Sequence, residues 1–460
     1  MKTSSSLSIP KLRDDLTGRV IAPDDDGYDE ARTVFVGGID RRPAVIVRVA
    51  NATDVSYVVS LAHGTGVELA VLGGGHSGPG FGVCDGGIVL DLSAMKGLDI
   101  DADGHSAWAE TGLTAAEYTN AAGARGLATG FGDTGSVGIG GLTLGGGLGF
   151  LLRKHGLTID DLLAAEVVTA DGELLHVDDE THPDLFWAIR GGGGNFGVAT
   201  RFRFRLHDVP SIVGGILMLP ATPEVIASFV EEAEAAPEEL TTIANVMKAP
   251  PMPFIPEKHH GELAIFALMA YAGDTDAGER AVAPFRALAE PLADMLRPMS
   301  YSEIYMPDEE DYHPNAVGQT WFADHLDEEA PATILDRVAT SPAMMAVTQI
   351  RALGGAMARV PADATAFGHR GSRLMVTVAA VYEQLEETPQ HQAWIDDLSG
   401  TLRQDDQGTY VNFLGEEGER GVRDTYPGAT WDRLREIKGR YDPTNLFRLN
   451  QNIPPATERS

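Results

Sequence analysis

Three glycine-rich clusters lie within otherwise apolar stretches of this chain, and they limit most strongly what it can fold into. The first, at 73–80, contains a single histidine, His76, and the others lie at 138–149 and 191–197. Glycine lets the backbone approach a ligand closely, because no side chain stands between them. Leucines at 142, 144 and 148 are interleaved with the second cluster, which a plain surface loop does not explain. We therefore expect the clusters to line a ligand-binding site.

The composition indicates a globular protein of two lobes. At 460 residues the chain is longer than one hydrophobic core usually supports. Its net charge of −32 disfavours nucleic acid as a partner, because phosphate binding requires a basic surface. The only cysteine, Cys84, excludes an intrachain disulfide and a cysteine-based metal site. There is no signal-peptide core and no apolar run of membrane length, so we expect a cytoplasmic protein with no membrane partner.

The chain before His76 has the pattern of a strand–helix–strand unit, with strands at 44–49 and 67–71 and a helix from 51 to about 62. After about residue 208 glycine becomes less frequent, which is consistent with a separate α+β lobe. In that lobe we expect strands at 216–219, 263–268 and 374–378, and helices near 222–235, 275–292, 329–339 and 388–403. Residues 410–413 are expected to form a further strand and 431–441 an amphipathic helix.

The third cluster contains G-x-G-x-x-G from Gly192 to Gly197, the spacing of a dinucleotide fingerprint. Such a fingerprint must follow a strand and open a helix. Here the preceding residues, 183–190, have a helical pattern, and the following ones, 198–206, alternate like a strand. The order is reversed, so we reject an NAD-binding Rossmann site.

A set of motifs follows in order along nearly the whole chain. They are GGGHS at 73–77, GIVLDLS at 87–93, VGIGGLTLGGG at 137–147, DLFWAIRGGG at 184–193, NFGVAT at 195–200, YDPTNLF at 441–447 and NQNI at 450–453. Each is moderate evidence alone, whereas the ordered set is highly specific. In this set the chain resembles the berberine bridge enzyme-like branch of the vanillyl-alcohol oxidase superfamily of flavoproteins. The middle of the chain matches only weakly.

The resemblance implies an α+β, two-domain PCMH-type FAD-binding fold with a central antiparallel-sheet substrate domain. The implied boundaries are 1–207 and 406–460 for the FAD-binding domain and 208–405 for the substrate domain. It also implies FAD attached through His76, whose neutral imidazole is a competent nucleophile toward the electrophilic flavin methyl group. The implied reaction transfers hydride from the carbon of an alcohol or carbohydrate hydroxyl to flavin N5, and O2 or another acceptor reoxidises the flavin.

Further FAD contacts are implied by the same motifs. Amide side chains near the C-terminus both donate and accept hydrogen bonds, which suits a flavin ring edge or a buried turn equally well. The implied contact residues are Leu72, Gly73, Gly74, Gly75, Ser77, Gly78, Asp133, Thr134, Gly135, Val137, Gly138, Ile139, Gly140, Gly141, Leu142, Gly197, Val198, Tyr410, Asn412, Asn450 and Asn452.

Three positions bear on how the chain differs from its relatives. Many relatives carry a second, cysteinyl flavin link where this chain has Thr134, so we expect a single attachment and a more enclosed pocket. Relatives often place a tyrosine base where this chain has Phe413, which cannot accept a proton. A valine at the position of Ile139 favours reaction with oxygen in relatives, and the bulkier isoleucine indicates slower reoxidation. Oxidase and dehydrogenase activity both remain open.

The general base must lie within hydrogen-bond reach of the substrate heteroatom. Tyr410 is the first candidate, with Tyr301, Tyr305 and a surface histidine, His369, as weaker ones. For each weaker candidate taken by itself, an ordinary structural role is a simpler explanation than a catalytic one. The pair His259-His260 fits no metal-ligand spacing, so we assign no metal.

Two alternatives remain open. A mono-histidyl branch of the same family oxidises a C–N bond of a cyclic amine, and this chain resembles it as well. Alternatively, the chain binds flavin but has lost its catalytic machinery. Phe413, which stands where relatives often have a tyrosine base, is consistent with such a loss. The substrate is expected to be a small molecule, and the oligomeric state is not indicated.

Overall fold

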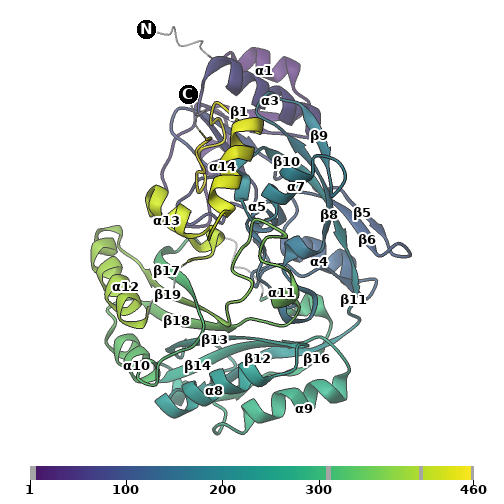
Figure 1. The fold of residues 1–460 in the computed structure, drawn as a ribbon. Coiled ribbons are helices and arrows are strands. Elements are labelled where there is room, and N and C mark those ends of the chain that lie inside the picture. The colour runs from purple at the N-terminus through teal and green to yellow at the C-terminus, as the bar shows by residue number, and fades with distance from the viewer. Residues whose placement is uncertain (1–6, 307–311, 404–407, 457–460) are drawn as a thin grey trace.

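The computed structural model describes residues 7–306, 312–403 and 408–456, which form two lobes (Figure 1). One, here called the glycine lobe, combines residues 7–208 with the C-terminal segment from 408 onward. The other, here called the sheet lobe, comprises residues 212–402. The C-terminal helices α13 (Gly418–Asp424) and α14 (Thr430–Tyr441) lie against the N-terminal half of the chain, so both ends of the sequence build the glycine lobe.

A four-stranded sheet begins the glycine lobe, in the order β1 (Arg19–Ile21), β2 (Val45–Arg48), β4 (Ile88–Asp91), β3 (Leu69–Leu72). Strands β2 and β3 both pair with β4 in parallel. Helix α3 (Ala52–Thr65) connects β2 to β3; the Asn51 side chain caps its first turn and Gly66, at φ 70°, ends it. The predicted strand–helix–strand unit before His76 is therefore confirmed.

A five-stranded antiparallel sheet completes the glycine lobe, in the order β5 (Leu98–Asp101), β6 (Ser106–Glu110), β10 (Val198–Arg205), β8 (Leu162–Val168), β9 (Leu174–Val177). In β10, Phe202 and Phe204 are buried, whereas the arginines that alternate with them, at 201, 203 and 205, are exposed. This alternation follows from the two-residue period of a strand. Helix α7 (Pro183–Ile189) precedes β10, which confirms that the third glycine cluster joins a helix to a strand.

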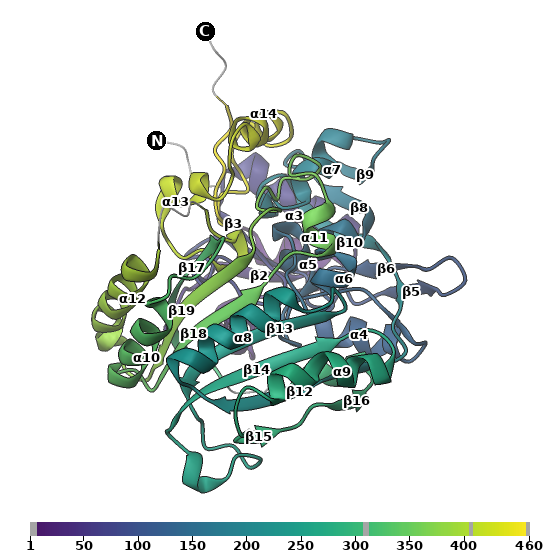
Figure 2. The same ribbon diagram turned by 60° about the horizontal axis from the view of Figure 1, so that its bottom comes forward.

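The sheet lobe contains one eight-stranded antiparallel sheet. Its order is β15 (Ala293–Asp294), β12 (Ile212–Pro220), β14 (Leu263–Tyr271), β13 (Leu240–Lys248), β18 (Met345–Ala352), β19 (Leu374–Tyr382), β17 (Asn315–Ala323), with β16 (Arg297–Met299) also on β12. Helices α8 (Pro223–Ala235), α9 (Thr275–Arg286), α10 (Ala330–Thr340) and α12 (Thr388–Leu402) cover the face away from the glycine lobe (Figure 2). The opposite face is directed toward the glycine lobe.

Two sequence predictions are wrong in detail. The expected helix 275–292 ends at Arg286, and the proline at 291 disfavours helical geometry at residue 290, so the helix does not resume up to 292. The expected strand at 410–413 is a 3-10 turn, Val411–Phe413, closed by a hydrogen bond from the Phe413 amide to the Tyr410 carbonyl. The α+β class and the central antiparallel sheet are confirmed, and the domain boundaries at 207/208 and 405/406 stay a prediction.

Shorter elements connect these sheets. They are α1 (Ile9–Asp15), α2 (Tyr28–Ala31), α4 (Ala115–Gly123), β7 (Leu127–Ala128), α5 (Ile139–Gly145), α6 (Leu152–His155), β11 (His207–Asp208) and α11 (Ala356–Arg359). None of the helices among the described residues combines the length and the apolar character that crossing a membrane requires. The cytoplasmic location stays a prediction.

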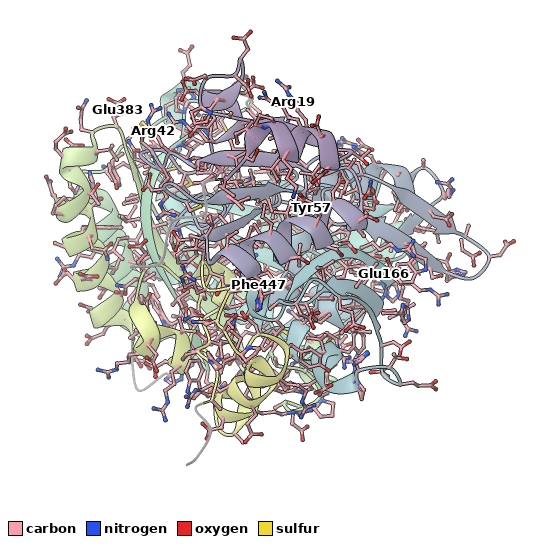
Figure 3. All side chains as sticks on the ribbon, turned by 90° about the horizontal axis from the view of Figure 1, so that it is seen from above. Arg19, Arg42, Tyr57, Glu166, Glu383 and Phe447 are labelled. Carbon is pink, nitrogen blue, oxygen red and sulfur yellow. The ribbon has the colours of Figure 1, made fainter. Side chains whose placement is uncertain are left out.

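The C-terminal segment shares an apolar core with the first sheet. Phe447 packs with residues of α3, β2 and β4, and it lies beneath α3 when the molecule is viewed from above (Figure 3). A buried ion pair fixes the segment further: Lys438 donates to Asp442 at 2.6 Å and to the carbonyls of Asn195 at 2.7 Å and Phe447 at 3.0 Å. The Asn195 side chain accepts from the Ile453 amide at 2.9 Å.

Candidate active site

The first two glycine clusters are in direct contact. The chain leaves β3 at Leu72 and passes through residues 73–75 to His76. A Cβ atom on Gly74 would lie 2.2 Å from the Gly138 amide nitrogen, and a Cβ on Gly138 would lie 2.4 Å from the Gly74 nitrogen. Any larger residue at either position would push the two backbones apart. The first two glycine clusters therefore meet in the fold, and their role in lining a ligand-binding site stays a prediction.

His76 lies beside this contact in a fixed loop. Its ring stacks on Phe35, with centroids 4.2 Å apart and planes inclined by 19°. The Ser77 carbonyl accepts a hydrogen bond from the Gly80 amide at 2.9 Å, so the chain turns directly after the histidine, with Gly78 inside the turn. The Arg41 guanidinium then donates to the Gly80 carbonyl at 2.7 Å. His76 as a whole residue is partly exposed.

The second cluster is anchored by backbone hydrogen bonds. Residues 135–139 run along 113–116: the Ala116 amide donates to Gly135, the Ala115 amide to Val137, and the Ile139 amide to Leu113, each at 2.9 Å. Helix α5 then begins at Ile139 and contains the predicted contacts Gly140, Gly141 and Leu142.

Three polar side chains precede α5. The Thr134 hydroxyl donates to the Asp133 carboxylate at 3.1 Å. The Ser136 hydroxyl is buried and has no hydrogen-bond partner among the described residues. A buried polar atom without a partner carries a cost in free energy, which a ligand removes by supplying the missing hydrogen bond.

Tyr410 occupies the most distinctive position. Its phenol oxygen accepts two hydrogen bonds of 2.8 Å, one from the Gly147 amide and one from the Asn412 side chain. The same Asn412 nitrogen donates to the Leu142 carbonyl at 3.0 Å, which fixes the amide orientation because a flipped oxygen would face that carbonyl. Burial raises the pKa of Tyr410 to about 12, although both N–H donors act in the opposite direction.

Arg351 connects the two lobes at this point. It is buried on β18, and its guanidinium is paired with Asp133 and lies 5.5 Å from the centroid of the Phe413 ring. Its Nε donates to Gln349 at 2.7 Å. The positive charge of Arg351 favours the phenolate form of Tyr410. Arg351 is not among the site residues predicted from the sequence; an arginine within the otherwise uncharged strand 345–352 was the available signal.

The weaker base candidates lie in less suitable places. Tyr301 and Tyr305 are buried in the main apolar core, and burial raises the pKa of both phenols well above their usual range. The Tyr305 hydroxyl donates to the Gly132 carbonyl at 3.3 Å. His369 is not a surface histidine: its ring stacks on Phe322, and its Nε2 contacts the Thr425 carbonyl at 2.9 Å. Burial lowers the pKa of His369. The structure therefore does not bring these three together with Tyr410.

The C-terminal amides are partly satisfied. The Asn450 amide nitrogen donates to the carbonyls of Gly194 and Phe447, each at 3.2 Å. The side-chain oxygens of Asn450 and Asn452 are buried and lack a partner among the described residues. These oxygens are acceptors for N–H groups of a ligand.

Gly197 and Val198 are explained by packing instead. A Cβ on Gly197, at φ 158°, would lie 2.6 Å from both the Val167 side chain and the Val168 carbonyl. Val198 is buried at the start of β10. Packing thus explains the glycine at 197, and contact of either residue with FAD stays a prediction.

These residues fit a flavin dinucleotide. Residues 73–75 and 138 carry no side chains, so a pyrophosphate or ring edge can approach their backbone closely. The unpaired Ser136 hydroxyl and the unpaired oxygens of Asn450 and Asn452 offer one donor and several acceptors. Among the described residues, no group of three histidine, cysteine, aspartate or glutamate side chains is arranged to hold a metal.

Comparison with known proteins identifies the family. Residues 43–178 match the FAD binding domain model, and residues 409–454 match the model described as berberine and berberine like. An FAD-linked oxidoreductase of Bacillus subtilis strain 168, named as uncharacterized, is 32% identical over 96% of this chain and 97% of its own length. The chain belongs to the berberine bridge enzyme-like family. It is therefore an FAD-linked oxidoreductase, and FAD is its cofactor.

Two further relatives support this assignment. The (R)-6-hydroxynicotine oxidase of Paenarthrobacter nicotinovorans is 30% identical to this berberine bridge enzyme-like protein over 98% of the chain and 99% of its own length. The crystal structure of 6-hydroxy-D-nicotine oxidase from Arthrobacter nicotinovorans superimposes with a TM-score of 0.86, at 26% identity and over 99% of this chain and 100% of the other. The predicted PCMH-type fold and FAD cofactor are confirmed.

Proposed function

We propose that this oxidoreductase carries FAD covalently on His76 and oxidises an alcohol or carbohydrate hydroxyl, with Tyr410 as the general base. Bound FAD supplies the hydride acceptor. The observation that carries the proposal is the Tyr410 oxygen, which accepts two N–H hydrogen bonds of 2.8 Å in a buried position beside the second glycine cluster. Two donors stabilise the phenolate more than the phenol.

The surroundings of Tyr410 support its role as a base toward a hydroxyl substrate. Burial raises its pKa to about 12, so the phenolate is the minor form near neutrality, and the two N–H donors and Arg351 act in its favour. As phenolate, Tyr410 would accept the hydroxyl proton, and Arg351 would supply a compensating positive charge nearby. Oxidation of a neutral amine does not require so strong a base. A xylooligosaccharide oxidase is 28% identical over 90% of this chain, and the hydroxynicotine oxidase leaves C–N oxidation as the second candidate.

The other candidate nucleophiles are unsuitable, which supports a single covalent link. Thr134, at the position where many relatives are expected to carry a cysteine, has no thiol. Cys84 is buried with its Sγ 3.7 Å from the Ile88 carbonyl, and burial raises its pKa to about 11. A thiol of such pKa is a poor nucleophile at neutral pH. His76 is partly exposed and follows directly on the contact of Gly74 with Gly138, so we assign the link to it alone.

Denaturing gel electrophoresis under ultraviolet light tests the attachment. The wild-type band should fluoresce, and His76→Ala should not. Absence of fluorescence in the denatured wild-type protein would refute the covalent link. Anaerobic bleaching of the bound flavin by a panel of sugars, alcohols and cyclic amines tests the reaction separately. Bleaching by cyclic amines alone would replace hydroxyl oxidation with C–N oxidation.

A further inference from the structure

A row of polar side chains crosses four strands of the sheet lobe. Asn245 on β13 is opposite Gln349 on β18, which is opposite Thr377 on β19, which is opposite Thr320 on β17. In the next row toward the strand ends, Arg351 is opposite Ile243 and Met375. We call Asn245, Gln349, Thr377 and Thr320 the polar row.

The polar row lies on the face directed toward the glycine lobe. Successive side chains of a strand point to opposite faces. Ala244, Val246, Ile350, Val376 and Val378 alternate with the row and belong to the apolar core shared with helices α8, α10 and α12. The row therefore points away from these helices. That face of the sheet is directed toward the glycine lobe (Figures 1 and 2), where Arg351 pairs with Asp133. Asn245, Gln349 and Thr377 are each partly exposed there.

Hydrogen bonds fix the orientation of the two amide side chains in the row. Asn245 donates to the Phe266 carbonyl at 3.0 Å, Gln349 donates to Asn245 at 2.8 Å, and Arg351 donates to Gln349 at 2.7 Å. Because each oxygen has a donor assigned to it, both amides are fixed against flipping. Each amide nitrogen makes one hydrogen bond among the described residues, and its second hydrogen is available.

Two hydroxyls complete the row at its other end. Thr320 and Thr377 share a hydrogen bond of 2.8 Å, in which either oxygen can be the donor. The Thr377 oxygen keeps spare capacity for a ligand, since a hydroxyl donates one hydrogen bond and accepts two. The whole row thus offers donors and acceptors without a formal charge.

Charge at this face distinguishes between substrate classes. Strands β13, β17, β18 and β19 contain no aspartate or glutamate. Asp133 approaches from the glycine lobe but is paired with Arg351. A cationic amine would find no unpaired carboxylate on these strands, whereas a hydroxyl can both donate to and accept from amides and threonines.

We propose that the polar row is the specificity-determining surface of this enzyme and binds an uncharged, polyhydroxylated ring of the sugar or polyol class. The inference rests on the proposed hydroxyl oxidation and adds the residues that select the substrate. Val347 and Ala379, which neighbour the row on the same face, provide an apolar border for the C–H surface of such a ring.

Thr377→Val and Thr348→Val form a matched pair that tests the row. Both remove one hydroxyl from neighbouring strands, but Thr348 points to the helix-covered face, where its hydroxyl is buried and has no partner in the part of the chain that the structure describes. With the sugar that reduces the flavin fastest, Thr377→Val should raise KM about 3- to 10-fold, as loss of one neutral hydrogen bond implies, and leave kcat within about twofold. Thr348→Val should change neither by more than about twofold. Equal effects of the two substitutions would overturn the role of the row.

Asn245→Leu provides a second variant at the opposite end of the row, and it should raise KM for the same sugar. A normal flavin content and thermal midpoint would show that each variant is folded. An unchanged KM in folded Asn245→Leu would also contradict the proposal, even where hydroxyl oxidation itself stands.

A charge comparison tests the substrate class. Glucose and glucosamine differ by one ammonium group, and the enzyme should reduce its flavin with the uncharged sugar at least about tenfold more efficiently, since an unpaired cation is costly at this face. Equal efficiency would refute the selection for uncharged substrates. Reduction by cyclic amines alone would remove the proposed function and this inference together.

Discussion

Replacing Tyr410 with phenylalanine separates its role as a base from its role in packing. The change deletes an oxygen that accepts from the Gly147 amide and from Asn412, each at 2.8 Å. Asn412 keeps its bond to the Leu142 carbonyl, so only the Gly147 amide is left buried without a partner. One such donor costs about 1–3 kcal/mol of unfolding free energy. The ring itself is retained, and we expect no cavity.

The catalytic loss should exceed this stability cost. Loss of a general base lowers kcat about 10²- to 10⁴-fold. Because burial raises the pKa of Tyr410 to about 12, only a small fraction is ionised near neutrality, and kcat/KM of the wild type should rise with pH through the alkaline range. In Tyr410→Phe this rise should disappear. Stopped-flow anaerobic reduction of the flavin between pH 7 and 10 measures both quantities.

Tyr426→Phe is a matched control for this experiment. Tyr426 is also buried, and its hydroxyl makes one long hydrogen bond, 3.4 Å to the Gly191 carbonyl. The control should lose less stability than Tyr410→Phe and keep wild-type kcat with the same dependence on pH. The reasoning fails if Tyr410→Phe retains kcat within about threefold of wild type and keeps the rise with pH, since a base contributes at least about 100-fold.

Three further outcomes follow from the structure. Ile139→Val, at a buried position that begins α5, should cost about 1 kcal/mol of stability and speed reoxidation by O2, measured by mixing reduced enzyme with aerated buffer. Lys438→Met leaves the buried Asp442 without its cation and should lower the unfolding free energy by about 3 kcal/mol in urea titration. Burial lowers the pKa of His155 to about 3, so this histidine takes up a proton below about pH 6.5 only in the unfolded chain. The free energy of unfolding should therefore decrease from pH 7 to 5. His155→Leu should make that decrease smaller.

The glycine clusters could be recognised from the sequence because their requirement is local. Gly74 and Gly138 each exclude a side chain at one backbone contact, and no other residue type meets that condition. The alternation of Phe202 and Phe204 with arginines is equally local, since it reflects a strand with one buried face. The order of helix, glycine loop and strand around the third cluster followed from the same periodicities.

Other features depend on contacts between distant segments and could not be predicted. Residues 410–413 have a strand-like pattern, but the bonds of Asn412 to Leu142 and of Tyr410 to Gly147 favour a turn. The importance of Arg351 becomes evident only from the register of β18 and from its pairing with Asp133 in the other lobe. Burial of His369 depends in the same way on Phe322.

The attachment of the C-terminal segment to Asn195 sets an order of events during synthesis. Asn195 accepts from Ile453, 258 residues later, and its carbonyl accepts from Lys438. A ribosome will have released every strand of the central sheet before it adds these partners. Contacts so distant in sequence form slowly and late. The glycine lobe therefore cannot complete its packing around Asn195 before translation has passed residue 453.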